Sequence, residues 1–139
     1  MNGAIKNNTA GEKTKERARV SIVDDDESVR EAIKSLLKSV GLNAEVFSSA
    51  NDFLNSDRID NTDCLILDLC MPGMSGLELQ DRLVSSAYRI PIIFITAHAQ
   101  DMEARNRALQ AGALDFLCKP FDEETLLDHV YSALEAAAK

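Results

Sequence analysis

The residues of this sequence that could take part in chemistry stand at the ends of apolar runs: Asp24, Asp25, Asp26, Asp68, Thr96 and Lys119. An ionised carboxylate beside buried residues costs free energy unless it is paired, binds a cation or reaches water. Carboxylates that lie close together repel, and one of them takes up a proton unless a cation intervenes. One or two carboxylates completed by water suit Mg²⁺ better than Ca²⁺. If these side chains meet in space, they can hold Mg²⁺ and, with the ammonium and hydroxyl groups, an anionic phosphoryl group.

Two alternating periodicities decide whether these residues meet. Short apolar runs typical of strands are expected at 19–23, 43–47, 64–69, 90–96 and 113–119. Amphipathic helices are expected to follow them, at 29–40, 48–54, 75–86, 101–112 and 122–138. Such strand–helix units indicate an α/β fold in which helices cover both faces of one parallel sheet. All strands of such a sheet end at the same edge, where ligands bind, so the residues named above are expected to converge there.

The charge of the chain is unevenly distributed. Its 139 residues are 45% hydrophobic and 27% charged, a composition that fits one soluble globular domain. Residues 1–19 carry five Lys or Arg and two Glu, a balance of +3, which leaves −11 for the rest of a chain whose net charge is −8. A domain this acidic is not expected to bind nucleic acid directly and suits a cation or a basic partner surface. The polar, pattern-free residues 1–18 are expected to form a flexible basic tail.

The apolar segments also bear on location. All strand candidates except 43–47, which reads as an edge strand, are almost continuously apolar, as in strands covered on both faces. Cys64, Cys70 and Cys118 lie in or beside these runs without Cys-x-x-Cys spacing, and are interpreted as small buried residues in a reducing compartment. No run reaches the roughly 18 residues that span a bilayer, and the N-terminus lacks the apolar core of a signal peptide. The cytoplasm is therefore the expected location, without contact to a membrane.

Four motifs resemble those of a known family, in the family's order: "IVDDD", "LILDLCMPGMSG", "IIFITA" and "FLCKPF". The resemblance covers about residues 18–138 and makes the chain similar to the receiver domain of bacterial two-component response regulators. It implies a flavodoxin-like (βα)5 doubly wound fold with strand order 2-1-3-4-5. The receiver domain is then expected at 19–138, and no output domain is expected in this chain.

The resemblance also implies the roles of the acidic residues. Asp68 would be the phosphoacceptor, taking a phosphoryl group from a phosphohistidine of a sensor histidine kinase or phosphotransfer protein. Mg²⁺ would be held by Asp25 directly, by Asp24 chiefly through water, by Asp68, and by the backbone carbonyl of Cys70. A carboxylate is a weak nucleophile toward phosphorus, so positioning and charge neutralisation must promote the reaction. Asp26 is expected to be solvated or to cap the following helix.

Further implied roles belong to the response to phosphorylation. Lys119 would contact the phosphoryl group, and the Thr96 hydroxyl would move toward it. Phe116 occupies the family's aromatic switch position and would follow Thr96 inward. The change would alter a surface at about 98–138, which in many family members dimerises. The peptide bond between Lys119 and Pro120 is expected to be cis.

Other readings remain open. An aspartate-nucleophile phosphohydrolase usually has a second Asp two residues after the nucleophile, and that position is Cys70 here. No G-x-x-x-x-G-K-[ST] motif is present, which disfavours a P-loop enzyme. The chain could also be a stand-alone receiver that acts by protein–protein interaction, or an interaction module that is never phosphorylated. The details of its motifs resemble receivers joined to LuxR-type helix-turn-helix DNA-binding domains. As a receiver, the chain is not expected to be an enzyme, and at most it would catalyse its own phosphorylation and dephosphorylation.

Four residues stand out beside these motifs. Cys70 and His98 each lie two residues after a motif residue, at positions that tune the lifetime of the phosphoryl group in this family. Cys118 is expected in the core. His129 lies in the last helix and is not expected to donate a phosphoryl group.

Overall fold

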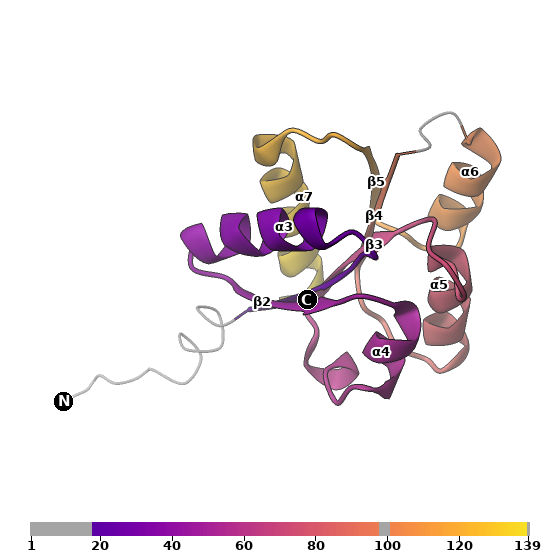
Figure 1. Ribbon diagram of the computed structural model, residues 1–139. Helices are drawn as coiled ribbons and strands as arrows, with labels where there is room; N and C mark the ends of the chain where they lie inside the picture. Colours follow the sequence, from indigo (N-terminus) through magenta and orange to yellow (C-terminus); the bar gives the residue numbers. More distant parts are fainter. Residues whose placement is uncertain (1–17, 98–100, 139) are drawn as a thin grey trace.

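The computed structural model describes residues 18–97 and 101–138 and arranges them in three layers, a sheet between two sets of helices (Figure 1). The parallel strands of the middle layer are β1 (Arg19–Val23), β2 (Asn43–Phe47), β3 (Cys64–Asp68), β4 (Ile92–Thr96) and β5 (Asp115–Cys118). They lie in the order β2-β1-β3-β4-β5, which confirms the expected flavodoxin-like topology with β2 at an edge. Most of the tail expected at 1–18, and His98, lie outside the described residues.

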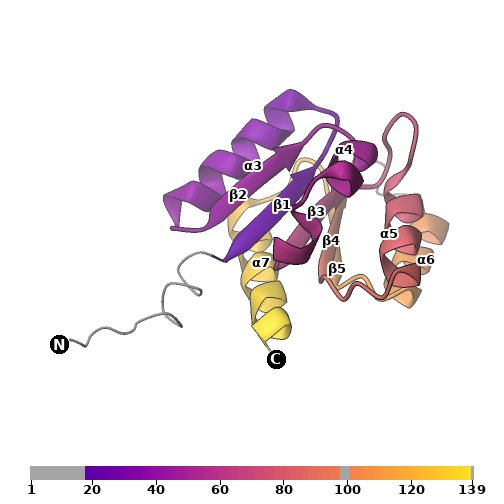
Figure 2. The same cartoon turned by 90° about the horizontal axis from the view of Figure 1, so that it is seen from below.

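The helices divide between the two faces of the sheet (Figures 1 and 2). One face is covered by α3 (Glu27–Ser39) and α7 (Glu123–Ala138), and the other by α4 (Ala50–Asn55), α5 (Gly76–Ser85) and α6 (Met102–Gln110). A short 3₁₀ helix, η1 (Ile59–Asn61), precedes β3. Side chains alternate along each strand, so Ile66 of β3 packs in the cluster with α3 and α7 while Leu67 packs in the other. No helix among the described residues is long and apolar enough to cross a membrane.

Three strands are shorter than the sequence predicts, and β3 ends at Asp68 rather than Leu69. β4 begins at Ile92 rather than residue 90, although the Pro91 carbonyl accepts a hydrogen bond from Leu65 N–H at 2.9 Å. β5 begins at Asp115 because Gly112, at φ +104°, ends the preceding helix in a turn that still includes Ala113. The apolar runs are thus longer than the strands that they form.

The expectation that the cysteines are buried is correct for Cys64 and wrong for Cys70 and Cys118, which are exposed. β5 is an edge strand in which only Phe116 is buried, so it is not covered on both faces as its apolar run suggested. Cys118 ends this strand and therefore does not pack in the core.

The loops at the carboxyl edge of the sheet form where capping residues start the helices. The Asp26 side chain accepts a hydrogen bond from Ser28 N–H and caps α3, one of the two roles expected for it. Ser75 and Glu78 form a capping box at the start of α5. Gly73 has φ +77° in the turn between β3 and α5, which favours glycine. The Lys119–Pro120 bond is cis, as expected.

Candidate functional site

The carboxyl ends of the strands bring the predicted residues to one edge of the sheet. Asp68 and Thr96 are the last residues of β3 and β4, and Asp24 and Lys119 each follow the last residue of β1 and β5. One carboxylate oxygen from each of Asp24, Asp25 and Asp68 lies within 4.8 Å of the others. We call these three residues the acidic cluster. Asp24 is 0% and Asp68 4% exposed, whereas Asp25 is exposed to solvent.

Lys119 supplies the positive charge beside the acidic cluster. Its Nζ lies 2.9 Å from Oδ2 of Asp24 and 3.6 Å from Oδ2 of Asp68. Its backbone N–H donates to the carbonyl of Thr96 at 2.7 Å, which fixes the chain beyond β5 against the end of β4. One ammonium therefore faces two buried carboxylates, and negative charge remains in excess.

The Asp24 side chain is held on one oxygen only. Oδ1 accepts a hydrogen bond from Asp26 N–H at 2.8 Å. Oδ2 is buried and accepts no hydrogen bond of good geometry from the described residues, although it forms the close ion pair with Lys119. A buried carboxylate oxygen with incomplete hydrogen bonding is costly. A hard cation coordinated there would satisfy it, so the acidic cluster fits Mg²⁺ by position and by ligand type.

The electrostatics of the site reflect this excess of negative charge. Burial, and secondarily the charge of Asp24, raises the pKa of Asp68 from 3.8 to about 7, against the opposing effect of Lys119. Burial alone would lower the pKa of Lys119, but hydrogen bonding and attraction to Asp24 and Asp68 outweigh it and raise the pKa. Without a bound cation, the acidic cluster therefore favours a proton on Asp68.

Thr96 and Phe116 lie inside the protein on neighbouring strands. Thr96 is 0% exposed and follows Ile95, which pairs with Asp68 across the strands. Phe116 is 8% exposed, and its ring centroid lies 6.2 Å from that of Phe94, its partner in the sheet. Both residues of the predicted switch thus point into the fold.

Cys70 contacts the acidic cluster through its backbone. Its N–H donates to Oδ1 of Asp68 at 3.4 Å, a long hydrogen bond. Burial and the charge of Asp68 raise the pKa of the Cys70 thiol, so the thiol stays protonated at neutral pH. The predicted metal ligand is the carbonyl of this residue, and that role stays a prediction.

Two residues near the site were missed by the sequence analysis. A Cβ atom on Gly76 would lie 2.4 Å from the carbonyl oxygen of Asp68, so only glycine lets α5 approach β3 this closely. Arg30 donates from Nη1 to the carbonyl of Asp24 at 2.8 Å. The only available indication was proximity in sequence, since Gly76 closes the "MPGMSG" turn and Arg30 follows the acidic triplet by one helical turn.

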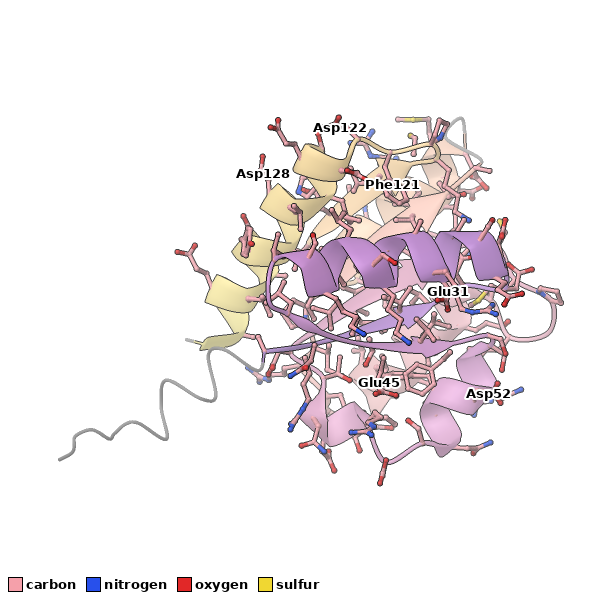
Figure 3. The ribbon with its side chains drawn as sticks, turned by 60° about the vertical axis from the view of Figure 1, so that its left-hand side comes forward. Glu31, Glu45, Asp52, Phe121, Asp122 and Asp128 are labelled. Carbon is pink, nitrogen blue, oxygen red and sulfur yellow. The ribbon has the colours of Figure 1, made fainter. Side chains whose placement is uncertain are left out.

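Exposed carboxylates lie on several elements, beside basic residues such as Lys38 of α3 and Arg58, whose side chain lies 3.9 Å from Glu45. Figure 3 shows exposed carboxylates on α3, β2, α4 and the α7 region: Glu31, Glu45, Asp52, Asp122 and Asp128. They agree with the negative balance of the sequence after the tail. This net negative charge disfavours binding to a nucleic acid backbone.

A family model described as "Response regulator receiver domain" matches residues 20–131. Response regulator protein TodT of Pseudomonas putida is 48% identical over 118 residues, which are 85% of this chain and 52% of TodT. Transcriptional regulatory protein TdiR of Thauera aromatica is 41% identical over 122 residues, 88% of this chain and 53% of TdiR. The chain thus spans about half the length of these curated relatives.

Solved structures agree with the fold. The structure of response regulator StyR superposes with a TM-score of 0.82 at 48% identity, covering 88% of this chain and 61% of the StyR chain. Both the topology and the sequence of the described residues therefore match the same class of protein.

Proposed function

The chain belongs to the response regulator receiver domain family, and on this premise we propose that Asp68 accepts a phosphoryl group and that the domain acts as a phosphorylation-dependent signalling switch. Membership of this family implies a kinase or phosphotransfer protein as partner. We propose as donor a phosphohistidine of a sensor histidine kinase or phosphotransfer protein. An Asp68 carboxylate oxygen bonds to phosphorus as the phosphorus–nitrogen bond breaks, and the histidine keeps that electron pair and takes up a proton.

The position of Asp68 is the observation that supports this proposal most. It ends the central strand β3, 4% exposed, within 4.8 Å of Asp24 and Asp25 and 3.6 Å from Lys119. Lys119, together with a cation bound at the acidic cluster, would offset the negative charge on the oxygens of the transferred group. An aspartate-nucleophile phosphohydrolase would usually have a second Asp at position 70, where this chain has Cys. The phosphohydrolase alternative is therefore disfavoured, and the relatives are response regulators.

Mg²⁺ is the proposed cofactor. The residues that would hold it are Asp24, Asp25, Asp68 and the carbonyl of Cys70, and the incompletely bonded Oδ2 of Asp24 supports this assignment. When bound, the ion neutralises charge on the phosphoryl oxygens and on the attacking carboxylate. The exposed position of Asp25 gives the cation a route from solvent.

Two residues of the chain are proposed to hold the transferred group. Lys119 already faces Asp68 and would pair with a phosphoryl oxygen, because an acyl phosphate adds negative charge at that point. Thr96, at the end of the adjacent strand, would donate its hydroxyl to another oxygen. Phosphorylation would thereby favour the arrangement with Thr96 and Phe116 inside the fold over one in which the ring of Phe116 lies outside.

The proposed output surface comprises α6, β5 and α7. Met102, Leu109 and Tyr131 on these helices are 54%, 38% and 45% exposed, which suits a contact that forms after phosphorylation. We propose that a phosphorylation-dependent homodimer uses this surface. Phe116 lies on β5, between α6 and α7. Its proposed role is to transmit the phosphorylation state of Asp68 to this output surface.

The proposed output is transcription control in the cytoplasm. The name of TdiR describes a transcriptional regulator, and this chain matches about half of it. We propose that DNA binding belongs to a separate output domain, because the chain after residue 19 carries a net charge of −11. A stand-alone receiver that acts by protein–protein contact is the alternative.

The test is phosphorylation by acetyl phosphate with Mg²⁺, followed by intact mass. We expect one added phosphoryl group on the native protein and none on Asp68→Asn or Asp68→Ala. Asp52→Asn, a matched change of an exposed carboxylate on α4, should leave the addition intact. Omission of Mg²⁺ should abolish the gain. Failure of the native protein to gain the group, or an equal gain in both Asp68 variants, would overturn the proposal.

A further inference from the structure

Arg30 connects α3 to the turn that carries Asp24 and Asp25. It is half-buried in the first turn of the helix, and its Nη1 donates to the backbone carbonyl of Asp24 at 2.8 Å. Its own N–H donates to the carbonyl of Asp26 at 3.0 Å. The ion pairs found among the described residues do not include Arg30. The guanidinium therefore binds the backbone of the acidic turn rather than its carboxylates.

With this contact, both backbone polar groups of Asp24 and one of its two carboxylate oxygens are hydrogen-bonded. Its N–H donates to the Phe47 carbonyl at 3.1 Å, and its own carbonyl accepts from Arg30. Oδ1 accepts from Asp26 N–H, and Oδ2 faces Lys119. Of these contacts, the one from Arg30 comes from a helix, and it ties α3 to the turn.

We propose that Arg30 is a positioning residue for the metal site, holding the Asp24 carbonyl so that the turn presents Asp24 and Asp25 to Mg²⁺ beside Asp68. This inference rests on the proposed function, in which the acidic cluster binds Mg²⁺. A charged donor to a carbonyl forms a stronger hydrogen bond than a neutral one. Mutation of a group that orients metal ligands typically lowers metal affinity by about 10- to 100-fold.

Charge and positioning predict opposite effects at this residue. A guanidinium near the acidic cluster repels Mg²⁺, so removal of its charge alone would tighten binding. Loss of a contact that positions the ligands would weaken binding instead. The sign of the change in Mg²⁺ affinity therefore separates the two.

The experiment measures Mg²⁺ binding to the whole chain by isothermal titration calorimetry. We expect Arg30→Gln to weaken the Kd by about tenfold. Arg30→Lys keeps the charge but loses the planar guanidinium group, so its Kd for Mg²⁺ should lie between those of the native chain and of Arg30→Gln. Lys34→Gln removes the same charge one helical turn further along α3 and should leave the Kd unchanged or slightly tighter. Urea unfolding with and without Mg²⁺ accompanies each titration.

Each outcome decides one question. If Arg30→Gln binds Mg²⁺ as tightly as the native chain or more tightly, the positioning role is wrong. If it lowers stability equally with and without Mg²⁺ at an unchanged Kd, Arg30 only supports the fold. If Arg30→Gln does not fold, Arg30→Lys decides, and a native Kd in that variant overturns the inference. If the native chain itself binds no Mg²⁺, the proposed metal site fails instead.

Discussion

Nζ of Lys119 lies 2.9 Å from Oδ2 of Asp24, so the ammonium that follows β5 pairs with the carboxylate that follows β1, although β3 and β4 lie between these strands. The carboxylate is 0% exposed, while the lysine side chain is 19% exposed. Removal of one partner of such a pair leaves a buried charge without compensation, which costs more than the pair itself gains.

Lys119→Gln should therefore destabilise the protein in the absence of divalent cations. We expect the free energy of unfolding to fall by about 2 to 3 kcal/mol, since Asp24 keeps its burial and loses its counter-charge. Mg²⁺ should recover part of the loss by binding the folded state alone. Urea unfolding with and without Mg²⁺ measures both effects. Lys34→Gln is the control, and a loss below about 0.5 kcal/mol in Lys119→Gln, as for an exposed ion pair, would contradict the prediction.

Asp68→Asn should stabilise the protein without divalent cations, and more so at higher pH. The folded pKa of Asp68 is raised to about 7, so the folded state holds a proton that the unfolded state loses above the ordinary value of 3.8. Native stability therefore falls as pH rises from about 4 to about 7 and changes no further through this group above that. Asn at this position has no such dependence, because it does not titrate.

The check is urea unfolding of the native protein and of Asp68→Asn in the presence of a chelator. The pH values are 4.5, 6 and 8, which lie near the start, within and above the range from about pH 4 to about pH 7. The advantage of Asp68→Asn should grow with pH to as much as about 3 kcal/mol. Ala87→Gly, which changes no titratable group, should differ from the native protein by the same amount at every pH. An Asp68→Asn advantage that stays constant or shrinks with rising pH would be incompatible with a raised pKa.

The convergence of Asp24, Asp68, Thr96 and Lys119 was predictable because it depends on where apolar runs end. Parallel strands share a carboxyl edge, so the order of the runs was enough to bring these residues together. The order of the strands needed the family resemblance, since periodicity alone does not determine which strands are neighbours.

Contacts to backbone atoms were not predictable in the same way. Arg30 donates to the carbonyl of Asp24, and Gly76 packs closely against the carbonyl of Asp68. Every residue type has a backbone carbonyl, so the sequence does not show which carbonyl is contacted. Cys118 was wrongly placed in the core because its run is apolar, whereas its exposure depends on how far the neighbouring helices cover an edge strand. Residue type therefore indicated which side chains meet at the site, but not how the backbone beneath them is held.

Ala87→Gly should stabilise the protein. Three helices, α3, α5 and α6, end with the same pair of hydrogen bonds, in which the residue two positions after the last helical residue adopts positive φ. That residue is Gly41 in α3 and Gly112 in α6, but Ala87, at φ +65°, in α5. A Cβ in this conformation costs about 1 kcal/mol or more, partly offset by the greater freedom of glycine in the unfolded chain.

We expect Ala87→Gly to raise the free energy of unfolding by about 0.5 to 1 kcal/mol in urea. Gly112→Ala makes the reverse change at the equivalent position and should lower it by about 1 kcal/mol. A loss of stability in Ala87→Gly would mean that the left-handed conformation is not strained.

Gly76→Ala should impair phosphorylation as well as stability. Its new Cβ would lie 2.4 Å from the Asp68 carbonyl oxygen, 3.0 Å from Cε1 of Phe94 and 3.1 Å from Cα of Leu69. The first and third of these are backbone atoms, so α5 and the end of β3 must separate and Asp68 must move. Overpacking of this kind costs about 1 to 3 kcal/mol, and a displacement near 1 Å can slow a positioned reaction by roughly 100-fold.

The rate of phosphoryl incorporation from acetyl phosphate, followed by intact mass, separates these two effects when Gly112→Ala serves as the control. That variant strains the backbone at the end of α6 and should lose a comparable amount of stability, about 1 kcal/mol, while keeping the native rate. Gly76→Ala should be at least about tenfold slower under conditions in which both variants are folded. A native rate in Gly76→Ala would show that Asp68 keeps its position when α5 is pushed away, and the close approach of helix and strand would then serve packing alone.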